Sequence, residues 1–109
     1  MDNYIRKAKV INVVDGDTID AIVDLGYSMT TVQRFRLIGI DTPERNEEGY
    51  LEATQFVREA VLDREVYIKS LKSDSFGRYL AEVFVEDDDC NYCLNELLLE
   101  KGFAKVYDK

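Results

Sequence analysis

The strongest constraint on the fold is a change in hydrophobic period near residue 50. Ahead of it, residues 4–14, 18–24 and 30–40 each alternate apolar or small side chains with polar ones, a pattern typical of half-buried strands. The only proline, Pro43, ends the third of these segments. Apolar side chains then recur at helical spacing, which predicts an amphipathic helix over residues 50–62. The sequence therefore predicts a sheet followed by a helix that packs on it.

The remainder of the sequence repeats this order. Residues 65–71 and 78–85 predict two further strands, residues 90–101 predict a second helix, and a short segment follows at 103–107. Three strands, a helix, two strands and a helix is the element order of an OB-fold, a five-stranded Greek-key barrel, here with two helices. We therefore expect a mainly β, α+β barrel in a single domain over residues 1–109. The alternation favours a small barrel with helices but does not by itself select the OB topology.

Composition removes several classes of chemistry. The sequence contains no histidine, which excludes Ser-His-Asp and Cys-His catalysis as well as histidine-ligated metal nucleases. The net charge of −8 disfavours broad nonspecific binding to nucleic acid, although a local basic rim around an acidic metal site would still attract phosphate. No apolar run is long enough to span a bilayer, so we expect no membrane partner. The start of the sequence lacks signal-peptide features, which slightly favours the cytoplasm over a mature secreted form.

Two short acidic motifs lie at the ends of predicted strands. The first is Asp15-Gly16-Asp17-Thr18, and the second is Ile40-Asp41-Thr42-Pro43-Glu44. Each motif alone is explained as a turn or a strand end. Together they would bring the carboxylates of Asp17, Asp41 and Glu44 close to one another at neighbouring strand ends, where like charges repel unless a cation lies between them. Oxygen ligands from separated segments favour a hard ion, Ca²⁺ or Mg²⁺.

Arg36 lies five residues before Asp41, and Arg78 follows both motifs along the chain. Either arginine alone is explained as a solvated or salt-bridged side chain. Beside a carboxylate-bound divalent ion, the two guanidinium groups would bind phosphate and stabilise the charge that develops at phosphorus. Cys90 and Cys93 allow a redox pair at a helix start, but their place on an apolar stripe favours buried core cysteines.

These motifs resemble the staphylococcal nuclease (thermonuclease) family, and the resemblance covers nearly the whole chain in order. The matching stretches are VVDGDTI at 13–19, FRLIGIDTPE at 35–44, the segment from Asp74 through Gly77-Arg78 to Leu80-Ala81, and NELLLEKGFAKV at 95–106. The family combines an OB-fold barrel with Ca²⁺-dependent cleavage of DNA and RNA phosphodiesters.

The resemblance implies a role for each matching residue. Calcium would be bound by the carboxylates of Asp17 and Asp41 and by the backbone carbonyl of Thr42, with Asp15 behind the metal ligands. Glu44 would hold or deprotonate the attacking water. Arg36 and Arg78 would bind the scissile phosphate and its transition state. The implied products end in a 3′-phosphate and a 5′-hydroxyl.

The sequence departs from the family pattern near the second arginine. Ser75 and Phe76 replace a lysine and a tyrosine, so Phe76 retains only an aromatic face for stacking on a base. Tyr107 would supply a second aromatic wall beside the nucleotide. The loop after Glu44 is short and carries Glu47 and Glu48 where the family has lysines. These departures predict weaker or different substrate binding more than lost chemistry.

Three functions remain compatible with the sequence. The first is an active monomeric nuclease acting on single-stranded or denatured DNA and on RNA. The second is the same barrel recruited as a binding module for protein or nucleic acid, which the acidic surface favours. The third is a plain oligonucleotide-binding barrel, which needs a basic, aromatic groove and is poorly supported at this net charge. We favour the nuclease because the sequence contains all six residues to which the resemblance assigns metal binding, activation of water or phosphate binding: Asp17, Arg36, Asp41, Thr42, Glu44 and Arg78.

Overall fold

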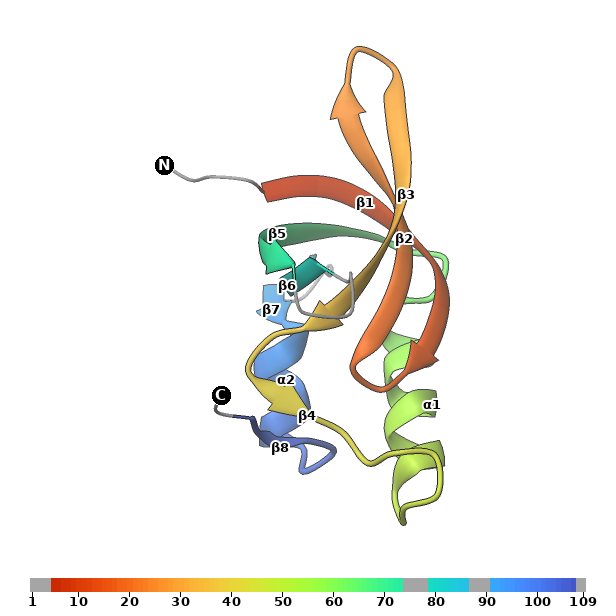
Figure 1. The fold of residues 1–109 in the computed structure, drawn as a ribbon, viewed down its shortest axis with the longest axis vertical. Coiled ribbons are helices and arrows are strands. Elements are labelled where there is room, and N and C mark those ends of the chain that lie inside the picture. Colours follow the sequence, from red (N-terminus) through yellow and green to blue (C-terminus); the bar gives the residue numbers. More distant parts are fainter. Residues whose placement is uncertain (1–4, 74–78, 87–90, 108–109) are drawn as a thin grey trace.

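A computed structural model describes residues 5–73, 79–86 and 91–107 of the chain. The structure has eight strands and two helices among these residues, with α1 between β4 and β5 and α2 between β7 and β8 (Figure 1). They are β1 Ile5–Asp15, β2 Thr18–Gly26, β3 Met29–Leu37, β4 Ile40–Asp41, α1 Tyr50–Val61, β5 Glu65–Ser73, β6 Tyr79–Glu86, β7 Asn91–Cys93, α2 Leu94–Glu100 and β8 Lys105–Val106.

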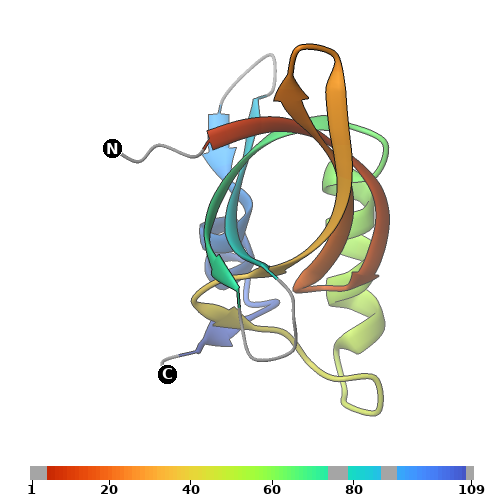
Figure 2. The same cartoon turned by 45° about the horizontal axis from the view of Figure 1, so that its top comes forward.

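Five of the strands close into a barrel. The main sheet has the order β3-β2-β1-β5-β6-β7, and a parallel pairing of β3 with β6 joins its ends, with Phe35 opposite Tyr79 and Leu37 opposite Ala81. β7 extends the sheet beside β6 outside this closed ring. Figure 2 looks into the barrel, with α1 on the β1–β2 side and α2 beside β6 and β7. The predicted OB-fold barrel with two helices is confirmed.

The core follows from the alternation along the strands. β2 buries alternate side chains from Ile19 to Val23, and β1 alternates through Ala8 and Val10 until an irregularity in its pairing shifts the alternation. α1 buries Ala53, Val57 and Val61 at intervals of one helical turn. Each large apolar side chain buried in this way contributes roughly 1.5–3 kcal/mol. Phe56 on α1 stacks on Phe103, which follows α2, with 4.7 Å between the ring centroids, and both rings pack against the core.

The predicted third strand over 30–40 is wrong at its end. β3 stops at Leu37, a turn occupies residues 38–39, and β4 begins at Ile40. Gly39 has a φ of +83°, a left-handed conformation that breaks the strand and that glycine adopts at low cost. β4 then pairs antiparallel with β8, not with a barrel strand. The apolar run across this turn concealed the break, because Leu37 and Ile40 are both buried.

The predicted second helix is too long at its start. Residues 91–93 form β7, paired with β6, and α2 begins at Leu94. Cys93 is half-buried next to the helix start, and desolvation by burial raises the pKa of its thiol, so the thiol is neutral near pH 7. Cys90 lies outside the described residues. The buried face of α2 consists of Leu94, Asn95 and Leu98.

Asn95 joins α2 to the barrel through a buried polar network. Its Oδ1 accepts the backbone N–H of Val83 at 3.1 Å. Its Nδ2 donates to the carbonyls of Ile38 at 3.0 Å and Ala81 at 3.1 Å. Val83 and Ala81 lie on β6 and Ile38 lies in the turn between β3 and β4, so the Asn95 side chain joins this turn to β6 and α2. Within the described ranges, neither helix has the length and the apolar character needed to cross a membrane.

Candidate active site

The turn at residues 15–17 joins β1 to β2 and packs tightly against the loop after β4. A Cβ atom on Gly16 would lie 3.0 Å from both Oγ1 and Cγ2 of Thr42 and 3.1 Å from the Cβ of Ala53 on α1. Only glycine fits such an approach without displacement of its neighbours. The turn is therefore held between the second acidic motif and the first helix.

Asp17 ties the two acidic motifs together. Its side chain is largely buried, with 11% exposed. Oδ1 accepts the hydroxyl of Thr18 at 3.0 Å, and Oδ2 accepts the backbone N–H of Thr42 at 3.2 Å. Its backbone carbonyl accepts the N–H of Leu37 at 2.8 Å. Two predicted site residues that are 25 positions apart, Asp17 and Thr42, are thus in direct contact.

Arg36 lies between the two motifs with 13% of its side chain exposed. Its Nη1 donates to the carbonyls of Leu37 and Ile40, both at 3.0 Å, and lies 3.5 Å from Oδ2 of Asp17. Its Nη2 lies 3.4 Å from Oδ1 of Asp41. Two carboxylates share one guanidinium, so the cluster retains one negative charge. That residual charge and the oxygen donors suit a hard cation.

The remaining predicted residues differ in their surroundings. Glu44 is exposed on the loop after β4, where its backbone N–H donates to Oε1 of Glu47 at 2.8 Å. Asp15 accepts the hydroxyl of Tyr50 on α1 at 2.8 Å. The buried Oγ1 of Thr42 has no hydrogen-bond partner among the described residues. Sequence patterns did not single out the Tyr50 contact, because they assigned Tyr50 only to the apolar face of the helix.

Arg78 and Phe76 lie outside the described residues. Within the part of the chain that the structure describes, no three His, Cys, Asp or Glu side chains form a group able to hold a metal ion. Asp17 and Asp41 are instead linked through Arg36, with 37% of the Asp41 side chain exposed. A cation here would need donors beyond these side chains, such as backbone carbonyls, water or a bound phosphate.

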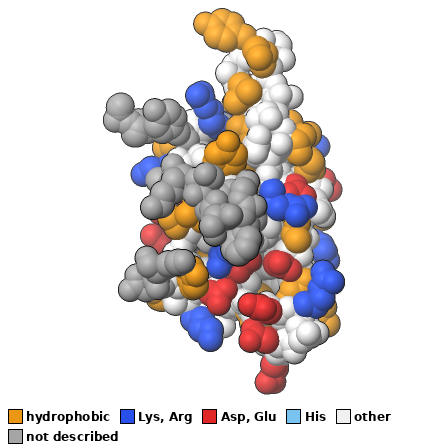
Figure 3. Space-filling view, viewed as in Figure 1, with side chains coloured by type: hydrophobic (Ala, Val, Ile, Leu, Met, Phe, Trp, Pro, Cys, Tyr) orange, Lys and Arg blue, Asp and Glu red, His pale blue; other side chains and the backbone are white. Residues whose placement is uncertain are grey.

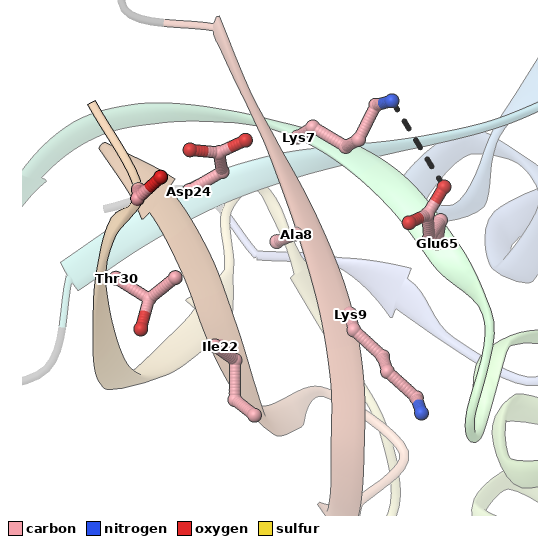
Figure 4. Close-up of a pocket in the computed structure, with 8 residues that line it drawn as sticks. Lys7, Ala8, Lys9, Ile22, Asp24, Thr30 and Glu65 are labelled. Atoms are coloured by element: carbon pink, nitrogen blue, oxygen red, sulfur yellow. Dashed lines mark ion pairs between the residues drawn. The ribbon is translucent and has the colours of Figure 1, made fainter. Parts of the chain in front are cut away.

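The site lies on an acidic part of the surface. Figure 3 shows acidic side chains gathered around β4 and the loop that follows it, with basic side chains nearby. A separate shallow hollow of about 240 Å³ lies over the outer side of β1 and β2 (Figure 4). Lys7 and Glu65 form an ion pair of 4.0 Å beside it. None of the predicted site residues lines this hollow, so it is distinct from the cluster around Arg36.

Comparison with known proteins identifies relatives for most of the chain. Residues 34–109 match the family described as staphylococcal nuclease homologue. A thermonuclease of Staphylococcus hyicus is 34% identical over 90% of this chain and 57% of its own length. An uncharacterized protein of Methanocaldococcus jannaschii is 32% identical over 91% and 58%, and an uncharacterized endonuclease of Escherichia coli O157:H7 is 29% identical over 93% and 61%. The chain spans about three fifths of the length of these relatives.

Proposed function

Because this chain belongs to the staphylococcal nuclease homologue family, we propose that it hydrolyses phosphodiester bonds of nucleic acid in a Ca²⁺-dependent reaction. The observation that carries this proposal is the fixed position of one guanidinium group. Arg36 is held by two backbone carbonyls and lies between the carboxylates of Asp17 and Asp41. A preorganised guanidinium of this kind suits the charge that develops on a phosphoryl group during attack.

Calcium would be held by the carboxylates of Asp17 and Asp41 and the backbone carbonyl of Thr42. When bound, it would reduce the negative charge on the phosphate and position the attacking water. The excess of two carboxylates over one guanidinium supports this donor set, because the remaining negative charge requires a counter-ion. The contact of Asp17 with the N–H of Thr42 keeps the proposed donors in register.

The other side chains of the site have separate roles in the proposed reaction. Glu44 accepts a proton from the attacking water, and its exposure leaves it accessible to solvent. Arg36 binds the phosphate and stabilises the transition state, a role that we also assign to Arg78 from its motif. Asp15 does not bind the metal directly in this scheme. Through its bond to the hydroxyl of Tyr50, it holds the turn at residues 15–17 against α1.

We propose unpaired DNA and RNA as substrates, cleaved by a monomer to leave 3′-phosphates. Phosphate-directed arginines discriminate poorly between DNA and RNA, and an unpaired strand can present its bases to aromatic side chains. Phe76 is the aromatic contact proposed for a base. The ring of Tyr107 lies against the guanidinium of Arg36.

The proposal is tested by digestion of single-stranded DNA and of RNA in Ca²⁺, in chelator, and with Glu44→Gln. We expect cleavage in Ca²⁺ alone, and a loss of at least a hundredfold for Glu44→Gln. Glu48→Gln is the matched control, since Glu48 is an exposed glutamate on the same loop. Cleavage that persists unchanged in chelator or in Glu44→Gln would contradict the mechanism.

The acidic surface supports one competing function, a binding module without cleavage. Acidic side chains around β4 disfavour tight binding of a polyanion and would suit a basic protein partner (Figure 3). The same digestion separates the two functions. A folded protein that cleaves neither substrate in Ca²⁺ would favour the binding module.

A further inference from the structure

The ring of Tyr107 lies over the guanidinium of Arg36. The Cζ of Arg36 is 5.4 Å from the ring centroid, within the range of a cation–π contact. Tyr107 is 45% exposed, whereas the Arg36 side chain is 13% exposed, so the ring forms part of the cover over the guanidinium. The sequence resemblance implied that this ring would form a wall for the nucleotide. In the structure, one face of the ring covers Arg36.

The position of the ring is set by backbone pairing. β8 pairs with β4, with Val106 opposite Ile40 and Lys105 opposite Asp41. The N–H of Tyr107 donates to the carbonyl of Gly39 at 3.0 Å. Tyr107 therefore comes directly after β8, the strand that pairs with β4 and its Asp41, and its backbone is bonded to the turn between β3 and β4.

The side chain of Arg36 also binds the backbone around this turn. The Nη1 of Arg36 donates to the carbonyls of Leu37 and Ile40, on either side of Gly39. These bonds and the contact with Asp41 all lie at the edge of the guanidinium. Edge bonds restrain the group within its plane, whereas the ring restrains it perpendicular to that plane. The two kinds of contact together fix the direction of the remaining N–H groups.

We propose that Tyr107 is a positioning residue for Arg36, acting through the face of its ring. This inference rests on the proposed nuclease function, in which Arg36 binds the phosphate. A guanidinium held on its edge and on one face reaches the transition state with little reorganisation, so loss of the ring lowers kcat more than it raises KM. Because one face of the ring covers Arg36, that face does not stack on a base. The phenolic hydroxyl has no role in this arrangement.

The test compares Tyr107→Phe, which keeps the ring face, with Tyr107→Leu, which removes it. We expect Tyr107→Phe to retain kcat within twofold, and Tyr107→Leu to lower kcat about tenfold with a smaller change in KM. Val106→Thr is the matched control on β8, because Val106 is 71% exposed and the substitution preserves β-branching. An equal loss of kcat in Tyr107→Phe and Tyr107→Leu, or a change confined to KM, would overturn the proposal. Either result would favour a direct contact of Tyr107 with the nucleotide.

A double-mutant cycle shows whether the ring acts through the arginine. In an Arg36→Lys background the fork-shaped group is absent, so Tyr107→Leu should cost much less than it does alone. Equal costs in both backgrounds would overturn the proposal. Thermal unfolding of each variant is measured alongside, so that a loss of folded protein is not counted as a loss of kcat.

A second readout is independent of cleavage. A ring over a guanidinium shifts the NMR signals of the arginine δ and ε protons upfield. We expect this shift for Arg36 in the parent protein and in Tyr107→Phe, and its loss in Tyr107→Leu. If the shift is present but the parent protein cleaves nothing, the proposed function fails while the packing of Tyr107 on Arg36 stands. If the parent protein lacks the shift, the positioning proposal is overturned whatever the activity.

Discussion

The ribbon formed by β2 and β3 has two very different ends. At one end Thr18 pairs with Arg36 beside the turn at residues 15–17, and Arg36 contacts Asp41 on β4 and Tyr107 after β8. At the other end Gly26 pairs with Met29, and the ribbon projects beyond the barrel (Figure 1). Tyr27 at this tip is 99% exposed. One ribbon thus supplies both a closely packed site and a solvent-exposed hairpin, and the segments that pack against its two ends differ.

Two arginines on β3 show what this difference does to identical side chains. Arg34 and Arg36 are two residues apart, so they point to the same face of the strand. Arg34 makes two hydrogen bonds to the carboxylate of Asp20, at 2.7 and 3.1 Å, and is 52% exposed. Arg36 is enclosed by two carbonyls, two carboxylates and an aromatic ring. Enclosure, not residue type, makes Arg36 the candidate for catalysis.

The largest predicted effect is the difference in cleavage between alanine substitutions of these two arginines. Arg36→Ala should lower cleavage at least a hundredfold, because it removes the group proposed to stabilise the transition state. It should also lower the free energy of unfolding by about 3 kcal/mol, because Asp17 would be left buried without its cation. Arg34→Ala should leave cleavage within twofold. Single-turnover digestion and urea unfolding measure both quantities, and similar losses for the two variants would remove the distinction between them.

A smaller difference in stability is expected between substitutions of Gly16, in the turn before β2, and of Gly26, the last residue of β2. Gly16→Ala should cost about 2 kcal/mol of folding free energy and reduce cleavage, because the new Cβ would meet Thr42 at 3.0 Å. Gly26→Ala should cost about 1 kcal/mol, since Gly26 has a φ of +88° but nothing within 4 Å of its Cβ position. Cleavage by the Gly26 variant should be unchanged. Urea unfolding and digestion check both variants, and a harmless Gly16→Ala would show that the turn is loosely packed.

The hairpin tip should tolerate a stabilising change. Tyr27 and Ser28 have φ values of 56° and 63°, as the turn of a two-residue hairpin requires, although neither residue favours this conformation. Replacing the pair by Asn-Gly should raise the free energy of unfolding by about 1 kcal/mol without altering cleavage. Thermal unfolding gives the first quantity and digestion the second. A loss of cleavage would connect the tip to the site and contradict the separation of the two ends.

The smallest effect is a pH dependence of the pair between Asp20 and Arg34. The hydrogen bond from Arg34 lowers the pKa of Asp20, so the pair stabilises the protein above the pKa of an unfolded aspartate, about 3.9. This contribution is lost as the pH falls through the lower pKa of the folded state. Asp20→Asn should therefore cost about 0.5 kcal/mol at pH 7, a value reduced by the exposure of Arg34, and progressively less in acid. Urea unfolding at pH 7 and pH 3 measures the difference, and a cost that grows in acid would reverse the sign.

Much of the fold and part of the site followed from local patterns. Alternation along the chain predicted β1, β2, β5 and β6, and helical spacing predicted α1, because each pattern reflects which side of an element is buried. The patterns missed the break at Gly39 and began α2 too early at Cys90. In both places a short strand outside the closed barrel replaced the expected element, and strands of two or three residues are too short for periodicity to identify.

The sequence alone determined the chemistry available to this protein. Without histidine, reactive groups are restricted to carboxylates, guanidinium and amino groups, hydroxyls and thiols, and the acidic motifs placed Asp17, Asp41 and Thr42 at strand ends. Only the tertiary structure decided how these groups combine. The pairing of β2 with β3 brought Arg36 beside Asp17, the turn between β3 and β4 brought Asp41 to it, and the pairing of β4 with β8 placed Tyr107 over it. Contacts between residues far apart in the chain depend on the packing of whole elements, which no local pattern records.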